Sequence, residues 1–282
     1  MENIKISGFS DEIDSNINVQ FRVLKKLGIE YFEPRGINGT NIADISDEQL
    51  VQLKQEMLNF GIKASSIGSP IGKISICDDF ESHIDKLKRV IYIAKELDCR
   101  YIRVFSFFIP QGEKAENFRD EVMRRMKVMT KLAEENDVIL LHENEKDIYG
   151  DTAQRCADVF ETVNSPNLRA VFDPANFVQV GQKTYPDAYQ IMMPYIKYMH
   201  IKDACGEEIV PAGQGQGCIE EILKDLYANG YQGFLSLEPH LGSFEGLASL
   251  ELDDKMLKLP KSGEGTFSLA FNELNKILDK IH

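Results

Sequence analysis

The 282-residue chain is predicted to fold as a single (β/α)₈ barrel, an α/β fold in which eight parallel strands alternate with helices. Short apolar runs alternate with segments of helical periodicity eight times along the sequence, and this is the pattern of consecutive βαβ units. The length is that of a typical barrel. No Pro/Gly/Ser-rich linker or low-complexity tract divides residues 1–282, so we expect one domain.

The first half of the chain contains four predicted strand–helix units. Gly28 and Gly61 are expected to end the first two helices, and Ser46 is expected to cap the second. The predicted strands are 4–9, 29–36, 62–70 and 99–108, and their helices are 16–27, 47–60, 80–97 and 115–136.

The second half contains four further units and a long connection. The predicted strands lie within 138–145, 168–176, 196–203 and 234–240, and their helices are 152–164, 186–194, 219–229 and 266–281. Residues 70–79 and 241–265 form connections of unusual length after strands three and eight. Active sites of barrels lie at this end of the strands, so we expect 241–265 to be a lid or an oligomer contact.

The composition is that of a soluble globular protein with a net charge of −13. Such a charge repels nucleic acid, and acidic residues interleave with the basic ones of the helix at 115–136. Apolar runs are too short to span a membrane, and the N-terminus does not have the pattern of a signal peptide. Five cysteines without a CxxC motif indicate reduced thiols. We therefore expect a cytoplasmic protein that binds neither nucleic acid nor membrane.

Four possible metal ligands follow successive strands of the second half. They lie in the motifs HENE (142–145), FDPAN (172–176), HIKD (200–203) and LEPH (237–240), and they are Glu143, Asp173, His200 and Glu238. The carboxyl ends of the strands of a parallel barrel meet at one mouth, so these side chains are expected to surround one cavity. Three carboxylates and an imidazole suit one divalent ion, with Mn²⁺ first and Co²⁺, Mg²⁺ or Zn²⁺ as alternatives.

Through these four motifs, the whole chain resembles the sugar phosphate isomerase/epimerase family of xylose isomerase-like barrels, which includes the ketose 3-epimerases. The resemblance places Glu143, Asp173, His200 and Glu238 on the metal ligands of the family. It also implies that Glu143 and Glu238 are catalytic and exchange protons with the sugar from opposite faces. A homodimer or homotetramer is a further implication of this resemblance.

Isomerisation or epimerisation of a sugar requires both a metal ion and carboxylates that transfer protons. The proton beside the carbonyl of a hydroxy ketone is too weakly acidic for a free carboxylate to remove, so the negative charge of the enediolate needs a Lewis acid. One carboxylate then removes the proton and a second returns it. We therefore expect a metal-dependent isomerase or epimerase of a small sugar, sugar phosphate or polyol derivative.

Two departures from the epimerase pattern affect the substrate rather than the metal. Asn176 stands three residues after Asp173, where the epimerases have a histidine, and residues 204–217 lack the arginine that the epimerases carry. His240 could supply part of the lost polar contact. The alternatives are therefore a dehydratase of an inosose-type keto-polyol from the same superfamily and a non-enzymatic sugar-binding barrel.

Further polar residues at strand ends are candidates for substrate binding. Glu33 and Arg35 either bind substrate or form an internal salt bridge, and Lys202 either binds a substrate oxygen or pairs with a carboxylate. Lys73 is a candidate from the loop after strand three. GQGQG (213–217) precedes a helix, but it matches no phosphate-binding motif and is interpreted as a loop.

Overall fold

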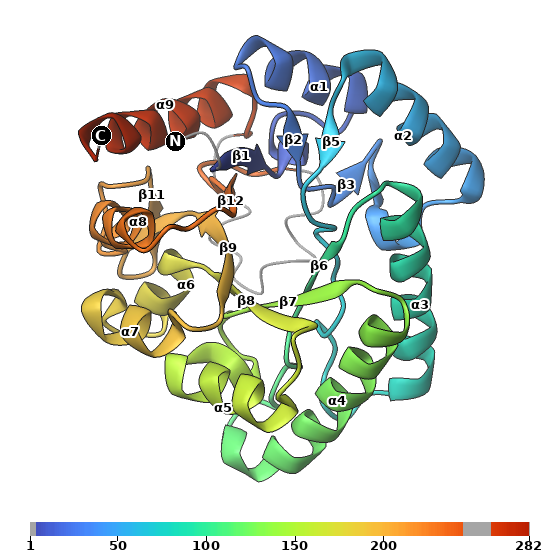
Figure 1. Ribbon diagram of the computed structural model, residues 1–282, viewed down its shortest axis with the longest axis vertical. Coiled ribbons are helices and arrows are strands. Elements are labelled where there is room, and N and C mark those ends of the chain that lie inside the picture. Colours follow the sequence, from blue (N-terminus) through green and yellow to red (C-terminus); the bar gives the residue numbers. More distant parts are fainter. Residues whose placement is uncertain (1–3, 245–260, 282) are drawn as a thin grey trace.

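The computed structural model describes residues 4–244 and 261–281, and it is a barrel of parallel strands surrounded by helices (Figure 1). Six strands form one curved parallel sheet. Their order is β1 (Lys5–Gly8), β12 (Phe234–Leu237), β9 (Ile196–Ile201), β8 (Leu168–Phe172), β7 (Ile139–Glu143) and β6 (Tyr101–Val104).

A second parallel pair, β2 (Tyr31–Phe32) and β5 (Lys63–Ala64), closes the wall. The Glu33 amide donates to the Gly8 carbonyl at 2.9 Å, and the Ile67 amide donates to the Tyr101 carbonyl at 2.8 Å. These bonds join the pair to β1 on one side and to β6 on the other. The predicted (β/α)₈ barrel is thereby confirmed, although these two strands are much shorter than the predicted 29–36 and 62–70.

The outer helices lie close to their predicted positions (Figure 1). Ser46 and Gln49 form a capping box at the start of α2, and Gly61 ends this helix with a φ of 62°. The region at 186–194 differs most, because a π-helical turn at Thr184–Ala188 precedes a short helix. The helices are α1 (Ile17–Lys26), α2 (Asp47–Phe60), α3 (Phe80–Glu96), α4 (Arg119–Glu135), α5 (Ala153–Val163), α7 (Tyr189–Met192), α8 (Ile219–Ala228) and α9 (Glu264–Lys280).

Several short elements at the mouth were not predicted. Two antiparallel hairpins lie there, β3 (Gly36–Ile37) with β4 (Thr40–Asn41) and β10 (Asp203–Cys205) with β11 (Glu208–Val210). Asp173 ends the predicted strand 168–176 early because its side chain caps the short helix α6 (Pro174–Gln179). Short 3₁₀ turns occupy Ser10–Glu12, Ile42–Asp44, Ala115–Phe118 and Tyr149–Asp151.

The barrel interior changes from apolar to polar toward the mouth. Leu141, Val171 and Tyr198 form a small buried cluster inside the wall. Arg103, Glu33 and the four predicted ligands are also buried in the interior, each at most 2% exposed. A larger apolar core lies between the strands and the outer helices. The fold therefore encloses a buried, charged site at one end of the strands.

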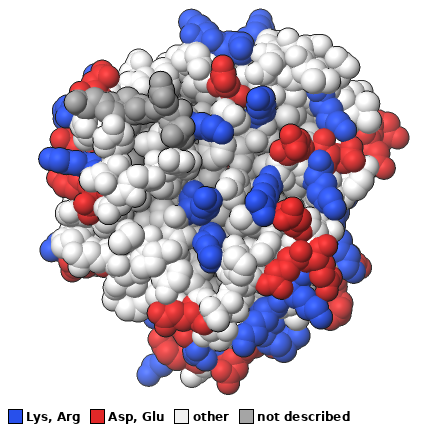
Figure 2. Space-filling model, viewed as in Figure 1, with Lys and Arg blue, Asp and Glu red and all other residues white. Residues whose placement is uncertain are grey.

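The outer surface is highly charged with both signs mixed. On the face in Figure 2, acidic and basic side chains lie beside one another over the outer helices. Within α4, Arg124 and Arg125 both pair with Glu121 at 2.7 and 2.8 Å. None of the helices in the described part of the chain is long and apolar enough to span a membrane. Most of the predicted lid, 245–260, lies outside the described residues.

Candidate metal centre and active site

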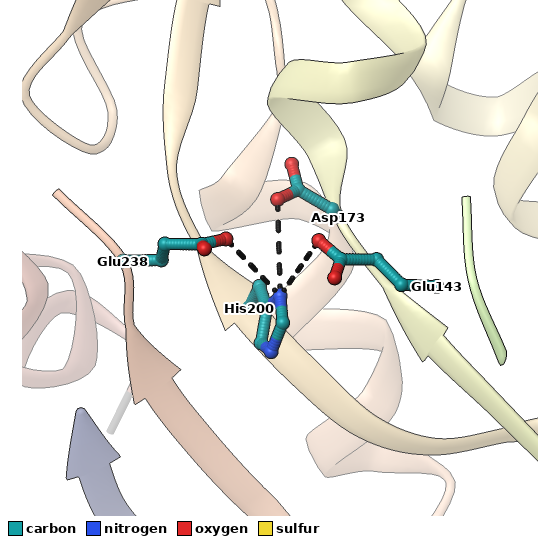
Figure 3. A group of neighbouring side chains, drawn as sticks. All are labelled: Glu143, Asp173, His200 and Glu238. Carbon is teal, nitrogen blue, oxygen red and sulfur yellow. Dashed lines mark hydrogen bonds and ion pairs between the residues drawn. The ribbon is translucent and has the colours of Figure 1, made fainter. Parts of the chain in front are cut away.

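The four predicted ligands come together at the mouth of the barrel (Figure 3). Glu143 ends β7, Asp173 follows β8, His200 lies in β9 and Glu238 follows β12. These four strands are consecutive neighbours in the sheet. One candidate ligand atom from each residue lies within 4.8 Å of the others, and all four residues are buried. The parallel sheet brings them together, because each lies within one residue of the carboxyl end of its strand.

Three carboxylates surround one nitrogen of His200 (Figure 3). His200 Nδ1 lies 3.0 Å from Glu143 Oε1, 3.3 Å from Glu238 Oε2 and 3.9 Å from Asp173 Oδ2. Burial lowers the pKa of His200, but the charges of Glu143, Glu33 and Glu238 outweigh burial and hold this pKa well above its usual range. The set therefore attracts positive charge strongly. Its oxygen and nitrogen donors fit a divalent cation.

The carboxylates differ in their proton affinity. Burial raises the pKa of Asp173 to about 7, although Lys202 opposes this rise. Burial also raises the pKa of Glu238, but the charges of Lys202, His200 and His240 outweigh it and hold this pKa well below the usual range. These positive charges therefore favour the ionised form of Glu238.

Two buried basic side chains, Arg103 and Lys202, pair with these acids. Arg103 Nη1 lies 3.3 Å from Glu143 Oε2 and 3.4 Å from Glu238 Oε1, and so it touches both glutamates. Lys202 Nζ lies 3.0 Å from Asp173 and 3.2 Å from Glu238. Of the two roles predicted for Lys202, the structure shows carboxylate pairing. Sequence reasoning missed Arg103, although a single arginine within the otherwise apolar run YIRVF indicates an acidic partner inside the barrel.

Glu33 and Arg35 do not pair with each other, but Arg35 forms internal salt bridges at the mouth with other acidic residues. Arg35 binds Asp11 at 2.8 Å, Glu12 at 3.2 Å and Glu238 at 3.0 Å, all through its guanidinium. The Arg35 guanidinium also lies 4.3 Å from the centre of the Phe9 ring. Glu33 points deeper into the barrel, toward the underside of His200. Asp11 and Glu12 were missed because they lie in a 3₁₀ turn without a strand pattern.

The remaining candidate residues also have partners within the chain. Asn176 Nδ2 donates to the Asn144 carbonyl at 2.8 Å and lies 3.4 Å from Glu143 Oε1. Lys73 Nζ pairs with Glu145 at 3.0 Å. The His240 amide donates to Glu12 at 2.8 Å, and its ring Nε2 lies 3.5 Å from Glu238. All three therefore lie near the mouth, in contact with its acidic residues.

The glycine-rich segment 213–217 folds around a carboxylate of the chain itself. The Asp203 side chain accepts from the amides of Gly213, Gly215 and Gly217 at 2.9, 3.0 and 2.8 Å. A Cβ atom on Gly215 would lie 2.3 Å from Asp203 Oδ1, so the close approach requires glycine. These amides are already occupied, which argues against phosphate binding here.

Comparisons with known proteins agree with this architecture. The family model described as a xylose isomerase-like TIM barrel matches residues 21–255. A 3-dehydroshikimate dehydratase from Bacillus anthracis is 24% identical over 130 residues, and the match spans 46% of each chain, about half the length of that relative.

Two solved structures share the fold over nearly their full lengths. The IOLI protein with a zinc atom has a TM-score of 0.76, 18% identity and 99% coverage of both chains. A D-tagatose 3-epimerase-like protein has a TM-score of 0.75, 15% identity and 98% coverage of both chains.

Proposed function

Since this chain belongs to the family of xylose isomerase-like TIM barrels, we propose that it is a divalent-metal-dependent isomerase or epimerase of a small sugar or polyol derivative. The observation that carries the proposal is the convergence of Glu143, Asp173, His200 and Glu238 on one buried point. The family contains both epimerase-like and dehydratase relatives, and both reactions begin by removing a proton next to a carbonyl group.

Those four residues would hold the metal ion, for which Mn²⁺ is the first candidate. Solved relatives with magnesium and with zinc support a divalent ion in this fold. When bound, such an ion supplies a Lewis acid that stabilises the negative charge developing on the carbonyl oxygen. The buried position of the four side chains excludes water and strengthens this electrostatic effect.

Two glutamates of the site have the positions that proton transfer needs. We propose Glu238 as the base, because it lies beside the proposed metal position and neighbouring positive charges favour its ionised form. Glu143 lies on the other side of His200 Nδ1 (Figure 3) and, in its protonated form, would donate its own proton to the opposite face of the carbon. Arg103 touches both carboxylates and fixes their separation. Two groups allow epimerisation, whereas isomerisation can use one.

Dehydration is the second candidate, and the match to a 3-dehydroshikimate dehydratase favours it. It shares the first proton transfer, which Glu238 would accept. The carbanionic centre then expels the hydroxyl group on the neighbouring carbon, and a proton donated to that oxygen releases water. Glu143 is placed to donate this proton, so the same residues serve either outcome.

The test is proton exchange in deuterated water. The metal-loaded protein is incubated with a panel of ketoses, keto-polyols and hydroxylated keto acids, and ¹H NMR follows the proton beside each carbonyl. Deuterium incorporation with return of a sugar supports an isomerase or epimerase, and incorporation with loss of a hydroxyl group supports a dehydratase. Absence of exchange across the panel, with metal bound, would contradict an enzyme of this kind and favour a sugar-binding barrel.

A pair of variants tests the assigned base. Glu238→Gln should lose at least about a hundredfold in turnover, because general acid–base groups typically contribute this much. Glu208→Gln changes an exposed glutamate of β11 and should keep wild-type turnover. A Glu238→Gln variant of full activity would rule out the two-glutamate mechanism.

A further inference from the structure

Glu33 lies directly beneath the metal-ligand candidate His200 and is fully buried. Its Oε2 atom accepts hydrogen bonds from the Tyr198 hydroxyl at 2.9 Å and the Ser236 hydroxyl at 2.7 Å. The same oxygen lies 3.4 Å from His200 Nε2. Its other oxygen, Oε1, has no hydrogen-bond partner among the described residues. This buried carboxylate therefore contacts the histidine rather than the open mouth.

The two nitrogens of His200 face opposite surroundings. Nδ1 faces the three carboxylates, and Nε2 points away from them (Figure 3). Among the described residues Nε2 makes no hydrogen bond, and the carboxylate oxygen that faces it is Glu33 Oε2 at 3.4 Å. The Phe9 and Tyr198 rings meet the imidazole edge-on, with centroids at 5.1 and 5.9 Å. Packing on two sides thus fixes the ring plane, so that each nitrogen keeps its own surroundings.

We propose that Glu33 is a positioning residue that accepts the Nε2–H of His200 and thereby keeps the Nδ1 lone pair directed at the proposed metal position. The inference rests on the proposed function, because it assigns Glu33 a role toward the same metal. Histidine ligands commonly donate their second ring N–H to a carboxylate, which fixes the tautomer and makes the ligand a better donor. Glu33 therefore acts from beneath the site and does not bind substrate.

The residues around Glu33 hold it for this role. Tyr198 and His200 are two positions apart on β9, so both side chains point into the barrel. Ser236 lies opposite His200 in the register of β12 with β9. The Tyr198 hydroxyl also bonds to the Ser65 hydroxyl at 2.8 Å, and Ser65 bonds to Ser7. Hydroxyl groups from two other strands, β9 and β12, thus hold the Glu33 carboxylate below the ring.

The first experiment measures metal affinity without using activity. Metal-free wild-type protein, Glu33→Gln and Ser7→Ala are titrated with Zn²⁺ and Mn²⁺ in competition with a chelator. Glu33→Gln should weaken binding about tenfold or more, within the range seen when such supporting partners are changed. Ser7→Ala removes a buried hydroxyl of the same network that does not touch Glu33, and it should bind metal as tightly as the wild type.

The second experiment observes the proposed hydrogen bond. In zinc-loaded protein with ¹⁵N-labelled histidine, the Nε2–H proton of His200 should resonate far downfield, as expected for donation to a carboxylate. In Glu33→Gln this signal should move upfield, whereas Ser7→Ala should leave it in place. If Glu33→Gln does not fold, Tyr198→Phe and Ser236→Ala each remove one hydrogen bond from Glu33 and should shift the signal from its wild-type position.

The outcomes separate the two proposals. Wild-type affinity and an unmoved Nε2–H signal in the Glu33 variant, or in both substitute variants, would overturn the role of Glu33 alone. A wild-type protein that binds neither Zn²⁺ nor Mn²⁺ would overturn both this role and the proposed function. Weakened binding with a shifted signal, together with a wild-type-like Ser7→Ala variant, is the expected result.

Discussion

At the residue scale, burial decides the charge of several side chains. His83 on α3 accepts a hydrogen bond from the Gly72 amide through Nε2 at 2.8 Å. Burial, and then the positive charges of Lys86 and Arg125, lower the pKa of His83 to about 4, against a smaller opposing effect of Asp78. The neutral imidazole thus anchors the connection 70–79. Gly72 itself has a φ of 90° and would place a Cβ 2.0 Å from the Phe105 carbonyl.

This histidine predicts a pH dependence of stability. Between the ordinary histidine pKa of 6.5 and the folded value of about 4, the unfolded chain binds a proton that the folded protein does not. The free energy of unfolding should therefore decrease as pH falls through this window. His83→Gln keeps a hydrogen-bond acceptor but has no group that titrates. As pH falls, the free energy of unfolding of this variant should therefore decrease less than that of the wild type. Urea unfolding of both proteins at neutral pH and at about pH 5 measures this change in the free energy of unfolding.

A second variant controls for net charge. Lys88→Gln alters an exposed residue of the same helix, and its stability should follow the wild-type pH dependence. If the free energy of unfolding changes equally with pH in the wild type and in His83→Gln, His83 is not held neutral in the folded protein.

At the element scale, one carboxylate organises the loop that leads from β9 to α8. Asp203 accepts three glycine amides of this loop, and it follows Lys202, which contacts Asp173 and Glu238. The position of the loop is thus tied to the metal-site side chains through two adjacent residues.

Replacing Asp203 with asparagine should loosen this loop locally. An amide group has one acceptor oxygen in place of two, so one or more glycine amides lose their partner at a cost of about 1–3 kcal/mol. Hydrogen exchange followed by mass spectrometry should show faster exchange in 203–218, with little change elsewhere. Asp187→Asn, an exposed acid outside this loop, should exchange like the wild type. Unchanged protection of 213–217 would refute the anchoring role of Asp203.

At the scale of the whole molecule, the proposed metal site joins four neighbouring strands of the barrel. Glu143, Asp173, His200 and Glu238 belong to β7, β8, β9 and β12 or to the residues directly after them. An ion held by all four would stabilise the folded state through mass action, because the unfolded chain cannot assemble the site.

Metal removal should therefore lower the melting temperature. At a free metal concentration one hundred times Kd, the stabilisation is about 2.7 kcal/mol, and Tm measured by calorimetry should rise with metal concentration after chelation. Asp173→Asn removes the negative charge of one proposed ligand and should reduce the rise in Tm that metal causes. A melting temperature that is identical in chelator and in saturating Mn²⁺ or Zn²⁺ would exclude a structural contribution of metal.

The sequence by itself predicted the barrel and the four residues that converge as the candidate metal centre. Periodicity and helix caps located the outer helices, because burial imposes a period of two on strands and about 3.6 on helices. Glu143, Asp173, His200 and Glu238 could be predicted because equivalent strand ends of a parallel barrel meet at one mouth. These are properties of local pattern and repeat, which a linear sequence records.

Only the tertiary structure decided which charged groups pair. Glu33 and Arg35 stand two residues apart, yet one lies beneath His200 and the other joins Asp11, Glu12 and Glu238. Arg103 reaches two glutamates that are 40 and 135 residues away in the chain. Such partners depend on side-chain height and direction inside a closed wall. These quantities are set by strand register and packing across the barrel, and no spacing along the sequence encodes them.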